Sequence, residues 1–90
     1  YVERFLGDFS YNPEEDLVRK TIWDTVIEGL EEIPAEQKWV FVKNEFEGVS
    51  FREMSDETGV NINTLLARKR YAVLHLRTKL QELYNAANEN

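Results

Sequence analysis

Side chains that can bind nucleic acid are concentrated in residues 61–71, which have the sequence NINTLLARKRY. Arginine and asparagine can form bidentate hydrogen bonds with base edges, and threonine and tyrosine hydroxyls can reach phosphates. A helical period of 3.6 residues would place one set of these side chains on a single face. Arg68 lies at the flank of that face, which consists of Asn63, Thr64, Ala67, Arg70 and Tyr71. The segment therefore predicts a helix that contacts DNA in the major groove.

The residues before this segment predict the elements that present it. Ser50 can cap a short helix, and Glu53, three positions later, completes a capping box. Gly59 can adopt a positive φ at low cost and so end that helix. Asn61 can cap the next helix by accepting from its free backbone N–H groups. Together these signals predict a helix-turn-helix over residues 50–84, whose second helix enters the major groove.

The first helix of the pair is expected to hold the phosphate backbone through its N-terminal turn, where Ser50 and Arg52 lie. An isolated basic triplet such as residues 68–70 is usually only a solvated helix face, so the prediction depends on the capped turn before it. The candidate DNA-binding residues are Ser50, Arg52, Asn61, Asn63, Thr64, Ala67, Arg68, Arg70 and Tyr71.

Hydrophobic periodicity and capping signals predict an all-α fold. Asn12 and Pro13 should begin the first helix, and Gly48 should end the second. The expected helices span residues 13–32, 34–47, 51–58 and 62–84. The expected organisation is a linker or loosely packed segment, a helical DNA-binding domain and a frayed tail, at residues 1–12, 13–84 and 85–90. No β-hairpin signal occurs in the sequence, so the domain should lack the strands of a wing.

The last predicted helix has an apolar stripe that should face the core, made of Ile62, Leu65, Ala72, Val73, Leu76, Leu80 and Leu83. Lys69 falls on this stripe, where its stem can pack while its ammonium group reaches water. The second helix should contribute Val40, Phe41 and Phe46 to the core. Trp23 and Trp39 should pack between the first two helices, and Trp39 is also a candidate for a partner interface.

Charge is divided unevenly along the chain. Residues 1–57 contain 15 Asp and Glu and six Lys and Arg, which gives a net charge of −9. Residues 58–90 contain two Asp and Glu and five Lys and Arg, which gives a net charge of +3. Phosphate attraction depends on the local patch, so the net charge of −6 does not exclude DNA binding. The net negative charge should nevertheless make the isolated chain a weak DNA binder.

The composition disfavours several functional classes. The chain has no Cys, and its single His, His75, is expected at the surface or between helices. No Gly-rich phosphate loop occurs, so we expect no enzyme, no cofactor and no metal site. No apolar run approaches the ~20 residues that span a bilayer, and no secretory leader opens the chain. We expect a cytoplasmic protein, and since the chain begins at Tyr1, a piece of a longer one.

An ordered set of features covers about half the chain: Ile33-Pro34, Glu47-Gly48, Ser50 to Met54, Gly59-Val60, and Thr64-Leu65 with Arg68. In this order the features resemble region 4 of sigma-70 family RNA polymerase factors, especially the extracytoplasmic-function type. The resemblance implies a bacterial initiation factor whose C-terminal domain recognises the −35 promoter element. It also implies docking on the flap of the RNA polymerase β subunit, and an anti-sigma protein as a further partner.

Two other functions remain open. The chain could be the output domain of a different transcriptional regulator, since such domains share this helical layout. It could instead be a helix-turn-helix that has lost DNA contact and serves as a protein-interaction module. The acidic charge favours the module, as do apolar or aromatic residues where the family commonly has basic ones: Leu66, Tyr71, Val73 and Leu74. A salt-dependent shift with promoter DNA would separate the module from both DNA-binding functions.

Overall fold

The computed structural model describes residues 16–88, and this part of the chain is helical throughout, without a strand. The elements are α2 (Asp16–Glu31), α3 (Ala35–Phe41), the π-helix η2 (Val42–Phe46), α4 (Phe51–Thr58) and α5 (Ile62–Ala87). The predicted all-α class is confirmed. The predicted linker over residues 1–12 and the helix start at Asn12 and Pro13 lie outside the described residues.

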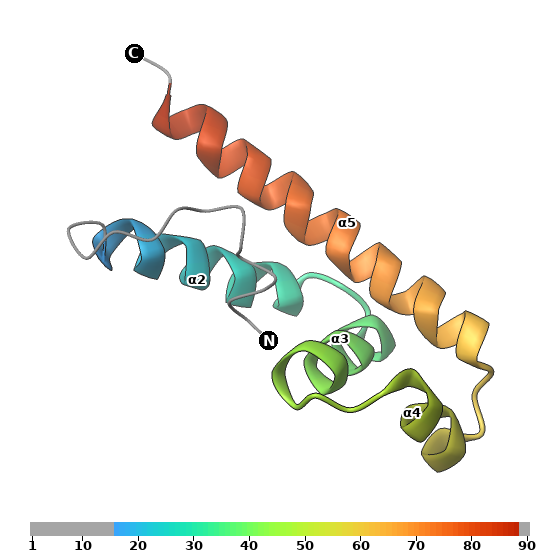
Figure 1. Cartoon of the computed structure of the whole chain (residues 1–90). Coiled ribbons are helices and arrows are strands. Elements are labelled where there is room, and N and C mark those ends of the chain that lie inside the picture. Colours follow the sequence, from blue (N-terminus) through green and yellow to red (C-terminus); the bar gives the residue numbers. More distant parts are fainter. Residues whose placement is uncertain (1–15, 89–90) are drawn as a thin grey trace.

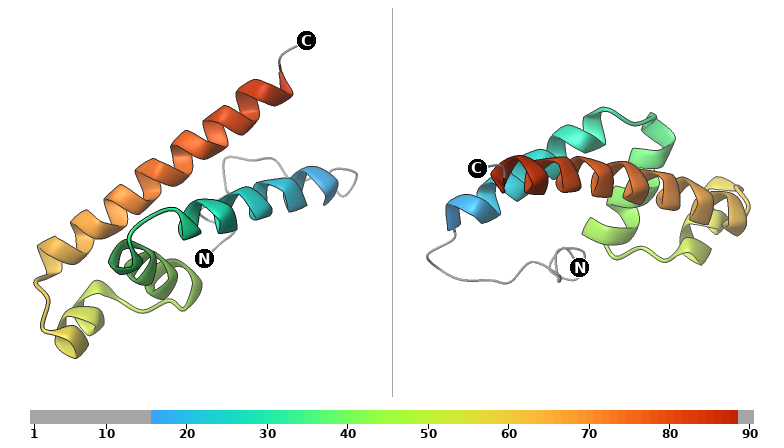
Figure 2. Two further views of the ribbon diagram at one scale, coloured as in Figure 1. Left: turned by 180° about the vertical axis from the view of Figure 1, so that it is seen from behind. Right: turned by 90° about the horizontal axis from the view of Figure 1, so that it is seen from above.

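Helix α5 is the long axis around which the other helices are arranged. Helix α2 runs in the opposite direction beside the C-terminal half of α5, while α3, η2 and α4 gather beside its N-terminal half (Figure 1). The views from behind and from above show the same arrangement (Figure 2). The N-terminal part of α5, with the candidate DNA-binding residues, therefore lies at the end of the molecule away from α2.

Two groups of buried apolar side chains hold the helices together. The larger joins α2, α3 and α5 and consists of Ile22, Val26, Leu30, Phe41, Ala72, Leu76 and Leu80. The smaller joins α3, α4 and α5 and consists of Val40, Met54 and Leu65. The predicted stripe of α5 is confirmed except at Ile62, which is 40% exposed. As the first residue of α5, Ile62 lies beyond the part of the helix that the smaller group covers.

Both tryptophans pack against these groups, but only Trp23 packs between the first two predicted helices, as both were expected to do. Trp23 packs against the larger group, and its ring meets the Phe46 ring edge-on at a centroid distance of 6.2 Å. Trp39 packs against the smaller group, and the Lys43 ammonium lies 5.7 Å from the centroid of its ring. Neither tryptophan is fully buried, so each keeps part of its ring at the surface.

Helices α2 and α5 approach each other closely at Gly29. This glycine is buried, and a Cβ atom placed on it would lie 2.6 Å from Leu76 Cδ2. A separation this short is below van der Waals contact, so a larger residue would require the buried Leu76 side chain to move. The close approach brings the polar side chains on the two helices within hydrogen-bonding reach.

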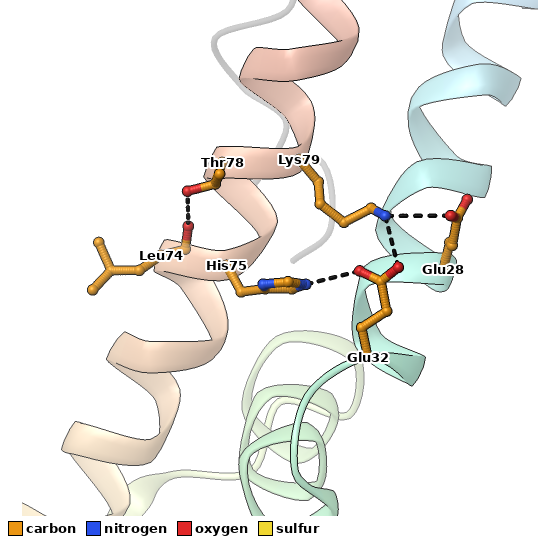
Figure 3. Close-up of polar contacts among 6 residues, drawn as sticks. All are labelled: Glu28, Glu32, Leu74, His75, Thr78 and Lys79. Atoms are coloured by element: carbon orange, nitrogen blue, oxygen red, sulfur yellow. Dashed lines mark hydrogen bonds and ion pairs between the residues drawn. The ribbon is translucent and has the colours of Figure 1, made fainter.

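Four of these polar side chains form a bridge between α2 and α5 (Figure 3). The Lys79 ammonium donates to Glu32 Oε2 at 2.9 Å and to Glu28 Oε1 at 3.3 Å, while His75 Nε2 lies 2.9 Å from Glu32 Oε1. The prediction of an interhelical or surface position for His75 is confirmed. Two hydrogen bonds, the stronger influence from Lys79 and the weaker from His75, hold the pKa of Glu32 below its ordinary value of 4.5.

We expect Glu32→Gln to lower the thermal midpoint near neutral pH and to leave it unchanged in strong acid. A carboxyl with a lowered folded-state pKa stabilises the fold above its unfolded pKa, and this stabilisation is lost as the pH falls through the folded value. The difference between parent and variant should therefore shrink below the ordinary value of 4.5. Thermal melts across the acid range measure it. Glu36→Gln, which changes an exposed carboxylate without an ion pair in residues 16–88, is the control.

The segment predicted as one helix over residues 34–47 consists of two helical forms. Helix α3 ends at Phe41 and continues as the π-helix η2, in which the Glu47 N–H donates to the Val42 carbonyl at 3.1 Å. The wider turn changes the direction of the side chains that follow it. Gly48, predicted to end this helix, has a φ of 70° immediately beyond η2.

Helix α5 is longer than predicted. It reaches Ala87 instead of ending near Tyr84, so the predicted frayed tail is helical over residues 85–87. Polar side chains support this last turn: Gln81 donates to Asn85 Oδ1 at 3.0 Å, and the Asn88 amide donates to the Tyr84 carbonyl at 2.9 Å. Such contacts offset the absence of core packing at a helix end.

Candidate nucleic-acid interface

The connection between α4 and α5 has the local geometry that the sequence predicts. Ser50 caps α4 by accepting from the Glu53 N–H at 3.1 Å, and Asn61 caps α5 by accepting from the Asn63 N–H at 2.7 Å. Gly59 ends α4 with φ 76° and ψ 4°. The reciprocal bond of a capping box, which the Ser50 N–H would donate to the Glu53 carboxylate, is absent among the described residues. The predicted box is therefore only half formed.

Two further hydrogen bonds make this connection rigid. The Ser55 hydroxyl donates to the Val60 carbonyl at 2.7 Å, and the Val60 N–H donates to Thr58 Oγ1 at 3.1 Å. The backbone of the turn is thus held to the last turn of α4 from both directions. This fixes the direction in which α5 leaves.

We expect Gly59→Ala to destabilise the fold by about 1–2 kcal/mol, because a Cβ atom disfavours the left-handed backbone. No atom lies within 4 Å of the position where that Cβ would stand, so the whole cost comes from the backbone. Urea unfolding of Gly59→Ala and of the parent measures the cost. Ala67→Gly is the companion variant, since it makes the opposite exchange in α5. If Gly59→Ala has the same free energy of unfolding as the parent, the positive φ at this position does not disfavour a residue with a Cβ atom.

Most of the candidate DNA-binding residues are exposed, namely Ser50, Arg52, Asn61, Asn63, Thr64, Arg70 and Tyr71. Ala67 and Arg68 are half-buried. Although the oxygens of Ser50 and Asn61 serve as caps, the Ser50 hydroxyl proton and the Asn61 amide protons can still donate to a phosphate. Capping and phosphate contact are therefore compatible at both positions.

The two arginines of α5 leave the helix on different sides. Residues two positions apart are separated by about 200° around an α-helix. Arg70 is exposed, and its guanidinium lies 5.6 Å from the centroid of the Tyr71 ring. Arg68 is half-buried and has no ion pair within residues 16–88. With the small Ala67 between them, the two arginines flank a low strip of helix surface that a ligand can approach.

The sequence prediction missed Arg77. A shallow groove of about 340 Å³ beside the candidate face is lined by Phe51, Leu66, Lys69, Arg70, Val73, Leu74 and Arg77. Arg77 is exposed and follows Arg70 by seven residues, which places it two turns further along the same side of α5. That spacing was the available signal. Leu66 and Leu74 are 43% and 51% exposed, so the groove is apolar with a basic edge.

The Lys69 ammonium is held by protein acceptors instead of being solvated as predicted. Its ammonium lies 2.5 Å from Glu45 Oε1 and also donates to Asn44 Oδ1. Glu45 is 6% exposed, and both acceptors belong to η2. The prediction was wrong because these acceptors lie 24 and 25 residues away, where helical periodicity cannot place them.

A second shallow pocket lies along α3 and η2 and shares no lining residue with the groove beside Arg77. Its volume is about 250 Å³, and its lining is Ala35, Lys38, Trp39, Val42, Lys43 and Glu47. Lys38 and Lys43 are held by Glu31 at 2.6 Å and by Glu47 at 3.2 Å. The open part of the Trp39 ring therefore stands between paired charges, an arrangement suited to a protein partner.

Comparison with protein-family models, with curated proteins and with solved structures finds no match for this chain.

Residues 16–88 contain no group of three or more His, Cys, Asp or Glu side chains placed to hold a metal ion. None of their helices is both long enough and apolar enough to cross a membrane. The strongest candidate surface is the exposed polar face of α5 with the N-terminus of α4.

Proposed function

We propose that this chain is the C-terminal domain of a sigma factor, in which α4 and α5 form a helix-turn-helix that recognises the −35 promoter element. The observation that carries the proposal is the rigid connection at Gly59, which presents the exposed side chains of α5. Asn63 and Arg70 supply groups for base edges. Ser50 and Arg52, at the start of α4, supply donors for phosphates. The mechanism is binding and positioning, without a chemical step.

The acidic remainder of the chain fits a domain that works while docked on polymerase. With a net charge of −6, the chain attracts DNA only through its local basic surface. Docking on the β-subunit flap would supply the effective concentration that intrinsic affinity lacks. The pocket around Trp39 is the docking surface we assign, because it lies on α3, away from the α5 face. An anti-sigma protein would be a further partner.

A hybrid factor tests this function. Residues 1–90 of this chain replace region 4 of a characterised sigma factor, and core RNA polymerase with the hybrid transcribes a promoter pool randomised at the −35 element. We expect one sequence to be enriched. The isolated chain should bind the enriched duplex only at micromolar concentration or weaker, with affinity that falls steeply with salt. Transcription without any −35 preference would overturn the proposal.

The protein-interaction module is the second candidate, and one observation favours it. Leu66, Tyr71 and Leu74 are 43%, 53% and 51% exposed on the surface assigned to DNA. Exposed apolar groups of this size commonly mark protein contacts. The module predicts that the isolated chain shows no salt-dependent DNA binding at all. A regulator output domain would bind a selected duplex yet give no −35 preference in the hybrid.

A further inference from the structure

The Lys69 side chain connects α5 to η2 and α4 beneath the candidate interface. Its ammonium lies 2.5 Å from Glu45 Oε1, donates to Asn44 Oδ1, and stands 5.7 Å from the centroid of the Phe51 ring. Glu45 and Asn44 belong to η2, whereas Phe51 is the first residue of α4. Asn44 in turn donates to the Val49 carbonyl at 3.0 Å, in the connection between η2 and α4. One side chain of α5 thus contacts both η2 and the first residue of α4.

Stability alone does not account for this ion pair. The Lys69 and Glu45 side chains are only 19% and 8% exposed, so both charges have lost most of their hydration. Glu45 Oε2 is buried and accepts no hydrogen bond within the described residues. Replacing such a pair with apolar side chains of similar volume is often neutral or stabilising. The apolar stripe of α5 would accept an aliphatic residue at this position.

The Lys69–Glu45 pair restricts the rotation of α5 about its axis more sharply than apolar packing does. The transfer free energy of apolar burial is non-directional, so packing alone orients α5 about its axis less sharply than hydrogen bonds do. Hydrogen bonds tolerate only a narrow range of distance and angle. A rotation of about 20° would move the tips of side chains on a helix of ~6 Å radius by about 2 Å. A recognition site must hold its side chains within about 0.5 Å of their productive positions.

We propose that the Lys69–Glu45 pair is a positioning element that fixes the rotation of α5 and thereby its sequence discrimination on DNA. Lys69 lies between Arg68 and Arg70 in the sequence, so the orientation of both arginines follows from where Lys69 is held. Although Lys69 also lines the groove beside Arg77, its ammonium is held by η2, so we assign it no base contact. This inference rests on the proposed function, because it assigns discrimination to a residue behind the recognition face.

The test removes the pair without leaving a buried charge. The variant Glu45→Met/Lys69→Met keeps the net charge and the approximate side-chain volumes. The control, Lys20→Met/Asp24→Asn, removes an ion pair of 2.7 Å that is exposed on α2, far from the interface. For each protein, fluorescence anisotropy at one moderate salt concentration gives the ratio of affinities for the enriched −35 duplex and a scrambled duplex. Thermal melts and salt slopes are measured in parallel.

We expect the apolar variant to unfold at the parent's temperature or higher and to keep its salt slope, while its discrimination ratio falls about tenfold, as on loss of one base contact. The control should keep the full ratio. A stable apolar variant with undiminished discrimination would overturn the inference and leave the proposed function intact. If the parent itself shows no discrimination, the proposed function fails and the inference fails with it.

A second variant covers the case in which the apolar variant does not fold. Asn44→Ala removes one acceptor of Lys69 and keeps the Glu45 pair. Rotation of α5 should be less restricted, so the discrimination ratio should fall about two- to threefold, the effect of a weakened hydrogen bond. A folded Asn44→Ala variant with the parent's ratio would count against the inference.

Discussion

Lys69→Met should destabilise the protein by about 3–5 kcal/mol, the cost of leaving a buried charge without its partner. Glu45 is 6% exposed, and its Oε2 already lacks a hydrogen-bond partner in residues 16–88. Without Lys69, Oε1 would lose its partner as well. Urea unfolding of Lys69→Met and of the parent measures this cost.

The single variant Glu45→Met should destabilise the protein less than Lys69→Met does. After Glu45→Met, the Lys69 ammonium keeps Asn44 as an acceptor and can reach water along its flexible stem, since its side chain is already 19% exposed. Lys43→Met, which breaks a partly exposed pair on the same π-helix, should cost about 0–1 kcal/mol. If Lys69→Met is as mild as Lys43→Met, the pair is not buried in solution as the structure places it.

Local signals were sufficient to predict the α4–α5 connection. Ser50 and Asn61 cap helices within three residues of themselves, and Gly59 adopts a positive φ whatever surrounds it. The period of α5 likewise identified Leu65, Leu76 and the other buried members of its stripe. Each of these features is decided by residues close in sequence, so the sequence alone can reveal it.

Features decided by distant residues were missed. The π-helix has the composition of an ordinary helix, and its shifted hydrogen bonds leave no pattern in the sequence. The partner of Lys69 lies 24 residues away, so its spacing predicted a snorkelling lysine instead of a buried pair. The groove beside Arg77 arises where α5 meets Phe51, the first residue of α4. Contacts between helices cannot be read from the period of either one.

Arg70→Ala should weaken binding to the enriched −35 duplex by about 1–3 kcal/mol and relax the preference at one base pair. Arg70 is exposed and has no ion pair within the described residues, so its guanidinium is available to a base edge. Loss of a bidentate contact should lower affinity for the enriched duplex more than for a scrambled one. Lys20→Ala, which removes a positive charge from α2, is the control for net charge.

Arg68→Ala should behave differently, because Arg68 is half-buried and leaves α5 on the other side. A residue there that contacts only phosphate should lower affinity evenly across sequences and reduce the salt slope by about one. Titrating both variants against enriched and scrambled duplexes at several salt concentrations separates the two roles. Equal, sequence-independent losses at Arg68 and Arg70 would mean that α5 holds the backbone without recognising bases. Unchanged binding in both variants would remove α5 from the interface and leave the protein-interaction module as the better account of its exposed leucines.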